Sequence, residues 1–305
     1  MRVLIIDLLA ERLEFGHGGN IEMIKPFVNF FSEIEVLLVT PQYENFSIHQ
    51  ESQLELNKIG KTDVPYWDDE VEFNTIITET IGDSIIRFIR IFTPLGNIGE
   101  LSTWFKENGV CGVYCSGSRR NVSQPEPWME PAKNLLNGAM MAEIPLLGIC
   151  FGHQLLADTL GGLVSRALKR TDAVFDLELT NLGLKDPLFD GLVNNNMKPV
   201  ILYTHQDHVE HIITERKLKF ALLGSSEHCK NAAIRVIDEN EELLPAWGVQ
   251  FHPEASKARI NRSYDLGHIS LEEKEAFNRD HDGARILDNF ASIVHSENKV
   301  NSEKG

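Results

Sequence analysis

The sequence has little cysteine and no long apolar run. Its 305 residues include four cysteines, Cys111, Cys115, Cys150 and Cys229. Their small number and irregular spacing exclude a disulfide framework and favour a reducing compartment. No window approaches the ~20 apolar residues of a membrane helix, and the apolar run at residues 1–7 is too short for a signal peptide. We therefore expect a cytoplasmic protein with no membrane partner.

Basic residues are also scarce. The chain has 29 Lys and Arg against 45 Asp and Glu, which leaves a net charge of −16. A field of this sign opposes binding to nucleic acid or to an anionic membrane, so we expect neither partner. The contents of 42% hydrophobic and 24% charged residues are those of a folded globular protein and exclude a disordered chain.

Short apolar runs alternate with helical patterns through the first half of the chain. The expected strands are Val3–Ile6, Ile34–Val39, Ile85–Phe92, Val110–Cys115 and Pro145–Cys150. The expected helices are Asn20–Phe31, Leu101–Asn108, Pro127–Ala142 and Gly152–Leu160. Runs that are apolar throughout are typical of parallel strands covered on both faces. The pattern predicts an α/β fold, an open and mostly parallel sheet with helices on both faces.

The second half is richer in strands. We expect Ala173–Thr180, Val200–Tyr203, Phe220–Gly224, Ala232–Ile237 and Trp247–Phe251 to form an antiparallel extension of the same sheet. An amphipathic helix at Gly283–His295 closes the fold. Residues 1–295 are expected to form a single domain, followed by a flexible tail at 296–305. Two polar stretches look inserted, 42–80, with the acidic run Asp68-Asp69-Glu70, and 255–282, with a possible helix at 271–278; the sequence leaves their role open.

Cys150 lies where an apolar strand turns into a helical pattern. The segment Gly148-Ile-Cys150-Phe-Gly152 has the strand–turn–helix context of a nucleophile elbow, with cysteine in place of serine. A sharp turn leaves no room for side chains two positions before and after the nucleophile, so glycines are needed there. The start of the following helix favours a thiolate. The sequence predicts that Cys150 is a nucleophile rather than a buried strand residue.

A second pattern, Gly248-Val-Gln-Phe-His252-Pro-Glu254, ends another apolar strand. A cysteine nucleophile needs a base, and the base needs an acceptor that orients its other ring nitrogen. His252 and Glu254 would supply both from one short segment. A zinc deaminase also uses His-x-Glu, but its Pro-Cys-x-x-Cys partner is missing downstream, so this interpretation fails.

Together the two segments resemble the signatures of class I glutamine amidotransferases, including GMP-synthase-type domains, over roughly Val110 to Glu254. The resemblance implies a flavodoxin-like fold and a Cys150-His252-Glu254 triad. Such a triad attacks the side-chain amide of glutamine, forms a γ-glutamyl thioester and releases ammonia. It also implies that no cofactor or metal is needed.

The resemblance places further residues in the site. The oxyanion would be held by the backbone N–H groups of Phe151 and Ser118. The turn Gly117-Ser118-Arg119 departs from the common pattern of two glycines and a proline, and similar Ser-Gly-Ser turns occur in stand-alone members such as γ-glutamyl peptidases. The residues expected to contact the substrate are Gly117, Gly152, Gln154, His205 and Asp207.

Other interpretations of these segments stay open. Residues 204–211 also suit a polar histidine-rich loop, and His205, His208 and His211 suggest a metal site only weakly, because no fixed four-ligand set is apparent. Gly16-His-Gly-Gly-Asn20 precedes a predicted helix and, without the full dinucleotide spacing, is interpreted as a loop; a place in the lining of the site or a role in cradling an anion stays open. Cys111 and Cys115 are interpreted as core residues.

These patterns raise three candidate functions. The first is a stand-alone amidotransferase that supplies ammonia to a separate synthetase, since the chain carries no nucleotide-binding domain of its own. The second is a γ-glutamyl peptide or conjugate hydrolase with the same triad. The third, a purely binding descendant, conflicts with the presence of all three triad residue types. The sequence favours the first, and it identifies neither the ammonia acceptor, nor the leaving group, nor the oligomeric state.

Overall fold

The computed structural model describes residues 1–44, 46–60, 63–66, 76–193, 198–211, 218–277 and 279–304. In this part of the chain, ten strands form one sheet in the order β3-β4-β2-β1-β5-β6-β12-β11-β10-β8. Its first half comprises β1 (Arg2–Ile6), β2 (Glu33–Val39), β3 (Ile76–Ile81), β4 (Ser84–Ile91), β5 (Val110–Cys115) and β6 (Leu146–Ile149). The rest comprises β8 (Glu178–Leu179), β10 (Lys219–Ser226), β11 (Cys229–Ile237) and β12 (Leu243–Val249). Neighbours from β4 to β12 are parallel, while β3 at one edge and β11, β10 and β8 at the other pair antiparallel.

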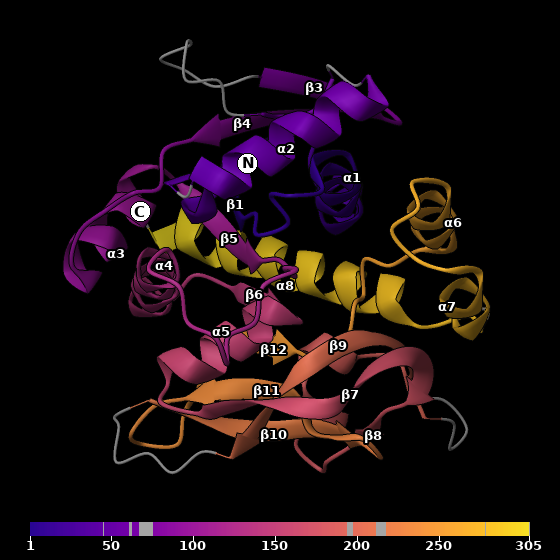
Figure 1. Cartoon of the computed structure of the whole chain (residues 1–305). Helices are drawn as coiled ribbons and strands as arrows, with labels where there is room; N and C mark the ends of the chain where they lie inside the picture. Colours follow the sequence, from indigo (N-terminus) through magenta and orange to yellow (C-terminus); the bar gives the residue numbers. More distant parts are fainter. Residues whose placement is uncertain are drawn as a thin grey trace.

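The helices cover both faces of this sheet, as predicted (Figure 1). Alternate residues of β1 point to opposite faces, so Val3 and Ile5 join one buried cluster and Leu4 and Ile6 join the other. Helices α1 (Leu13–Ile24) and α8 (Gly283–Lys304) pack in the first cluster. Helices α3 (Ile98–Glu107), α4 (Met129–Met141) and α5 (Phe151–Thr159) pack in the second. Short 3₁₀ segments η1 (Lys25–Asn29), η2 (Pro41–Glu44), η3 (Gly183–Lys185) and η4 (Pro187–Phe189) complete these layers.

The predicted strand Val200–Tyr203 and the first part of Ala173–Thr180 leave the main sheet, while the second part of Ala173–Thr180 stays in it as β8. β7 (Leu163–Asp176) and β9 (Val200–His211) pair with each other in a separate antiparallel sheet of two strands. β7 is only partly buried along most of its length, so it lacks the apolar faces of a strand inside a covered sheet. Figure 1 shows the pair lying over β10 and β11.

Other boundaries also differ from the sequence-based expectation. The helix expected at 20–31 is α1 at Leu13–Ile24, and the 3₁₀ segment that follows it contains Pro26, which lacks the N–H that an α-helix needs. Helix α8 continues to Lys304 through residues expected to form a flexible tail, because polar residues also form the solvated face of a helix. None of the helices formed by the described residues is both long and apolar enough to cross a membrane.

The two stretches that looked inserted contain regular elements. Residues 42–80 include α2 (Phe46–Ile59) and the start of β3, and the acidic run at 68–70 lies outside the described residues. Residues 255–282 form α6 (Lys257–Asp265) and α7 (Leu271–Ala276), while residue 278 lies outside the description. Helix α6 packs against α1, and α7 packs against β7.

The sheet register brings three strand ends together. Cys115 of β5 is opposite Gly148 of β6, and Ile149 of β6 is opposite Val249 of β12. Because these strands are parallel, their carboxyl ends lie at the same edge. The turn after β5, the start of α5 and the segment after β12 therefore meet there.

Candidate active site

Cys150 has the strained backbone of a nucleophile elbow. Its φ of 51° and ψ of −100° place it in a region that residues other than glycine rarely adopt. The residues two positions before and after Cys150 are glycines for the predicted reason, because a side chain would not fit at either position. A Cβ at Gly148 would lie 2.6 Å from the carbonyl oxygen of Gly152, and one at Gly152 would lie 2.1 Å from that of Cys115. The turn is closed by backbone atoms on both sides, so it holds the thiol at the start of α5.

His252 lies between Cys150 and Glu254. Its Nδ1 is 2.8 Å from the Glu254 carboxylate. Burial lowers the pKa of His252, but the charges of Cys150 and Glu254 and the hydrogen bonds to both outweigh burial and raise it to about 10. Burial raises the pKa of Glu254, and its interaction with His252 outweighs that effect, so the net pKa is below the ordinary value. The geometry favours an imidazolium beside a carboxylate.

Arg259 of α6 supports Glu254 and was missed by the sequence analysis. Its guanidinium donates to the Glu254 carbonyl oxygen at 3.1 Å and lies 3.8 Å from the carboxylate. The other terminal nitrogen donates to the Phe15 carbonyl at 2.9 Å, and the guanidinium lies over the Phe15 ring. A Cβ at Gly19 would meet this guanidinium at 3.0 Å. The glycine cluster at 16–20 is thus part of α1 rather than a loop, and it makes room for Arg259.

Two glutamines connect the elbow to the loop after β12. The Gln250 side chain is fully buried and its amide nitrogen lies 3.6 Å from the Cys150 sulfur. Gln154 donates to the Gln250 side-chain oxygen at 3.1 Å and to the Asp207 carbonyl at 2.7 Å. The amide nitrogen of Gln154 is therefore engaged within the protein. Gln250 belongs to the second signature, but no local pattern indicates its contact with sulfur.

The predicted oxyanion donors flank the thiol. Phe151 is the first residue of α5, and the first hydrogen bond of that helix runs from Gln154 N to Cys150 O. The N–H groups of Phe151 and Gly152 therefore have no acceptor within the helix. Gly117 and Ser118 line the same pocket as Cys150, and a Cβ at Gly117 would lie 3.0 Å from the His252 ring. Glycine at 117 is what lets the turn approach the imidazole.

His205 and Asp207 also reach the pocket lining, from β9. The His205 ring bonds to the Asp207 carbonyl oxygen at 2.9 Å, and burial lowers its pKa to about 3. One Asp207 carboxylate oxygen accepts from Ser123 N at 2.9 Å. The side chain of His211 lies outside the described residues, and no group of metal-ligating side chains is found among those described.

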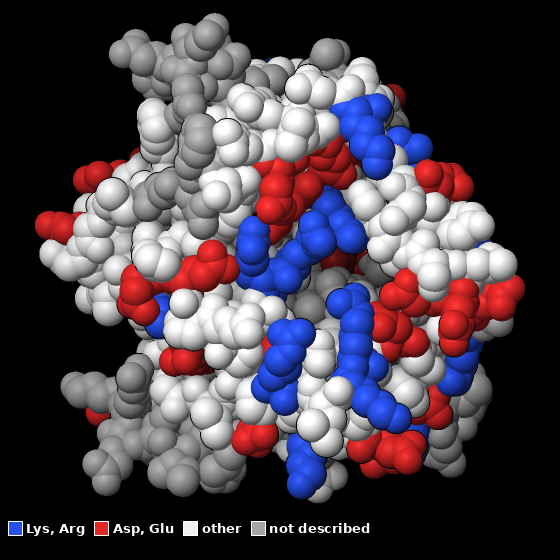
Figure 2. Space-filling model, in the orientation of Figure 1, with Lys and Arg blue, Asp and Glu red and all other residues white. Residues whose placement is uncertain are grey.

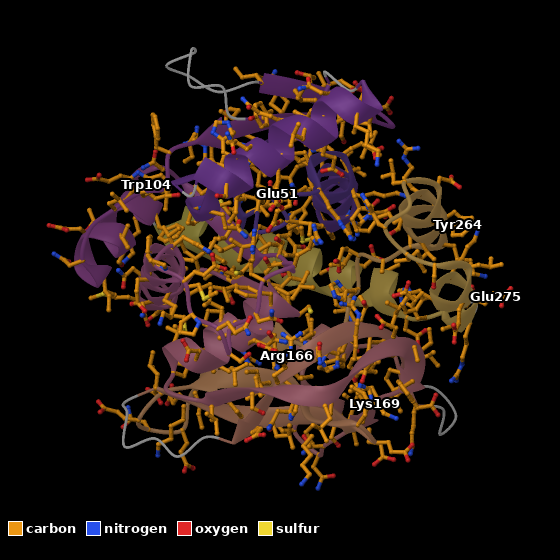
Figure 3. The ribbon with its side chains drawn as sticks, viewed as in Figure 1. Glu51, Trp104, Arg166, Lys169, Tyr264 and Glu275 are labelled. Atoms are coloured by element: carbon orange, nitrogen blue, oxygen red, sulfur yellow. The ribbon has the colours of Figure 1, made fainter. Side chains whose placement is uncertain are left out.

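One pocket of about 450 Å³ is lined by Cys150, His252, Glu254, His205 and Asp207, among others. Its walls come from the turn after β5, from β7 and β9, and from residues 255–277, which form the α6–α7 side. Figure 2 shows basic side chains gathered around the hollow in the middle of this face. Figure 3 labels one of them, Arg166 on β7, nearer the centre of the molecule than Tyr264 on α6 and Glu275 on α7. The second stretch that looked inserted is thus a wall of the site.

Comparison with known proteins agrees with this arrangement. The family described as "Glutamine amidotransferase class-I" matches residues 102–264. This chain belongs to the class I glutamine amidotransferase family. It is 33% identical over 170 residues to a glutamine-hydrolysing GMP synthase subunit from Methanothermobacter thermautotrophicus, covering 56% of this chain and 72% of that protein. It is 31% identical over 180 residues to the glutamine-hydrolysing GMP synthase of Pyrobaculum aerophilum, of which it covers 31%, and 57% of this chain is covered.

Solved structures show the same fold at low sequence identity. A glutamine amidotransferase from Thermotoga maritima matches with a TM-score of 0.50 and 17% identity, over 100% of this chain and 97% of that one. The glutaminase domain of Trypanosoma brucei CTPS with bound acivicin matches with a TM-score of 0.50 and 10% identity, over 93% and 97% of the two chains. The predicted fold class and enzyme family are therefore confirmed, and the chain is a glutamine amidotransferase of class I.

Proposed function

We propose that this amidotransferase cleaves the γ-amide of glutamine through a covalent thioester on Cys150. The observation that carries the proposal is the convergence of Cys150, His252 and Glu254 at one sheet edge. The Cys150 sulfur adds to the amide carbon, and the oxyanion is held by the N–H groups of Phe151 and Ser118. His252 gives its proton to the leaving nitrogen, the C–N bond breaks, and ammonia departs.

Water completes the reaction. The neutral His252 takes a proton from water, the hydroxyl adds to the thioester carbon, and the C–S bond breaks to give glutamate and the Cys150 thiolate. Glu254 bonds Nδ1 of His252 and so directs its Nε2 toward the reacting atoms. Arg259 fixes Glu254 in turn. The net reaction consumes one water molecule and needs no cofactor or metal.

The substrate is held by residues around the elbow. Gly117 gives the glutamyl chain close access to the backbone, and Gly152 contributes through the tight turn that presents the N–H of Phe151. Gln154, His205 and Asp207 form the opposite side of the pocket, where they are linked by hydrogen bonds. Because burial keeps His205 neutral, its ring lines the pocket without adding a charge.

The ammonia is supplied to a separate acceptor enzyme. The relative from Methanothermobacter thermautotrophicus supports this use, since it is named as one subunit of a glutamine-hydrolysing GMP synthase. The proposed compartment of this reaction is the cytoplasm, because its reducing conditions suit the four free thiols of the chain.

A second candidate is hydrolysis of a γ-glutamyl conjugate by the same chemistry. Its support is the pocket, because residues 255–277 add a wall that extends it beyond the elbow. The volume of about 450 Å³ lies in the range of about 300–1,000 Å³ that ligands larger than one amino acid occupy.

Purified protein tests both candidates. Release of glutamate from glutamine and from γ-glutamyl dipeptides is compared for wild type and Cys150→Ala. The proposal expects cleavage of at least one substrate by the wild type and none by the variant. Equal activity in both proteins contradicts the role of Cys150, and cleavage confined to dipeptides favours the second candidate.

A further inference from the structure

Arginines line the pocket of an otherwise acidic protein. The chain has a net charge of −16, yet the pocket that holds Cys150 has Arg12, Arg119, Arg120, Arg166, Arg170 and Arg259 in its lining. They come from four separate parts of the sequence. Figure 2 shows the basic side chains on both sides of the hollow, with acidic ones beside them. Such a concentration of one sign against the overall charge is typical of a binding site for an anion.

Most of these arginines have partners in the protein. Arg120 bonds Glu11 at 2.7 Å, Arg166 bonds the Gln206 side chain at 2.7 Å, and Arg170 bonds Asp172 at 2.9 Å. Arg259 is engaged by Glu254. By contrast, within the described ranges no side-chain hydrogen bond or ion pair is found for Arg12 or Arg119. These two guanidinium groups are available to a ligand.

Arg12 and Arg119 also lie close enough to repel each other. Burial and, after it, the charges of Arg119 and Arg170 lower the pKa of Arg12 to about 10. Glu55 and Glu11 act in the opposite direction but do not cancel this effect. Like charges held together in a partly closed pocket are stabilised by a bound anion.

The acidic residues of the lining do not neutralise the pair. Asp7 bonds Arg90 at 2.8 Å, and Glu254 bonds His252. The Glu273 carboxylate accepts a hydrogen bond from the backbone N–H of Ser270 at 2.6 Å and so caps α7. The charges of Arg170 and Arg12 also act on this carboxylate. Asp207 accepts from Ser123 N. Each of these carboxylates has a partner of its own.

We propose that Arg12 and Arg119 bind a carboxylate on the amine portion of a γ-glutamyl conjugate whose amide Cys150 cleaves. The inference rests on the proposed chemistry of Cys150 and specifies the second candidate substrate. Guanidinium groups pair with carboxylates through two parallel hydrogen bonds. The preferred leaving group is therefore an amino acid or peptide with a free carboxyl end, and not an uncharged amine.

Two substrates that differ only in this charge test the proposal. They are γ-glutamyl-alanine and γ-glutamyl-alanine amide, whose leaving groups have the same shape. The wild type should prefer the acid in kcat/KM, and Arg12→Gln or Arg119→Gln should reduce this preference by about tenfold, the effect of one charged hydrogen bond. Arg12→Lys should retain part of it. Raising the salt concentration should slow cleavage of the acid more than that of the amide.

Arg87→Gln is the matched control. Arg87 lies on β4 and pairs with Glu33 at the surface, so its loss should leave the preference unchanged. Two outcomes overturn the inference: no preference in the wild type, or an unchanged preference in both pocket variants. If the unchanged preference comes with equal losses for acid and amide, the arginines bind the glutamyl carboxylate instead. If neither substrate nor glutamine is cleaved at all, the proposed function has failed instead.

Discussion

Gly152 and Cys115 approach each other so closely that a Cβ at Gly152 would lie 2.1 Å from the Cys115 carbonyl oxygen. The contact joins the start of α5 to the end of β5. It therefore fixes the Phe151 N–H relative to the turn at 116–118, the two sides from which the proposed oxyanion donors come. Neither element can move away, because both continue into buried structure.

Gly152→Ala should therefore destabilise the protein by about 3 kcal/mol or more, at or above the usual cost of overpacking, since the contact involves backbone. Chemical denaturation measures the loss. Gly18→Ala is the control, because a Cβ there meets only Arg259 at 3.8 Å. It lies inside α1, where alanine favours the helix by up to ~1 kcal/mol. Equal stability of the two variants contradicts this account of the elbow.

His252→Ala should lower kcat by about 100-fold or more, because it removes the group that carries the proton. Glu254→Gln should cost less, since Glu254 orients the ring and does not transfer the proton. Single-turnover release of ammonia or amine from the substrate measures both. A larger loss in Glu254→Gln than in His252→Ala would reverse the two assigned roles.

Arg259→Met should lower kcat while changing KM little, because Arg259 positions Glu254 through hydrogen bonds and does not reach the substrate amide. The pH profile of kcat should shift as well, since the charge beside Glu254 is removed. Arg262→Gln on the same helix is the control, as Arg262 bonds Glu14 at the surface. Equal kcat values and equal pH profiles in the two variants would contradict the positioning role of Arg259.

The stability of the protein should fall in alkaline solution. His252 has an ordinary pKa of 6.5 when unfolded and about 10 when folded. The folded state therefore holds a proton that the unfolded chain releases, and the resulting stabilisation is complete below pH 6.5 and lost as the pH rises toward 10. Urea denaturation should show a steeper fall across this range for wild type than for His252→Gln. Parallel curves would contradict the raised pKa.

The parallel part of the sheet was predictable from the sequence, because β1, β2 and β5 are apolar on both faces and their pattern admits few alternatives. Helix α1 was not, because Gly16, Gly18 and Gly19 have low helix propensity and resemble a loop. Their presence is explained by tertiary contacts, with Leu9 for Gly16 and with Arg259 for Gly19. Contacts of this kind leave no pattern in the neighbouring sequence.

The residues of the candidate site also fall into those that the sequence could predict and those that it could not. Cys150, His252 and Glu254 lie in short segments whose spacing reflects a local turn, so the sequence could indicate them. Arg259 bonds Phe15, 244 residues away. Arg12 and Arg119 line the same pocket only after β1 and β5 pair. Contacts that the sheet assembles from distant segments appear only in the folded chain.

The central claim, that Cys150 is the nucleophile, is tested most directly by covalent labelling with acivicin, a reactive glutamine analogue. Burial raises the pKa of Cys115 far above its ordinary value and that of Cys229 to about 12, which leaves the partly exposed Cys111 as the internal comparison. Peptide mass spectrometry should locate one label on Cys150, in proportion to lost activity and absent in Cys150→Ala. Loss of activity with the label on Cys111, or full activity with Cys150 labelled, would contradict the account.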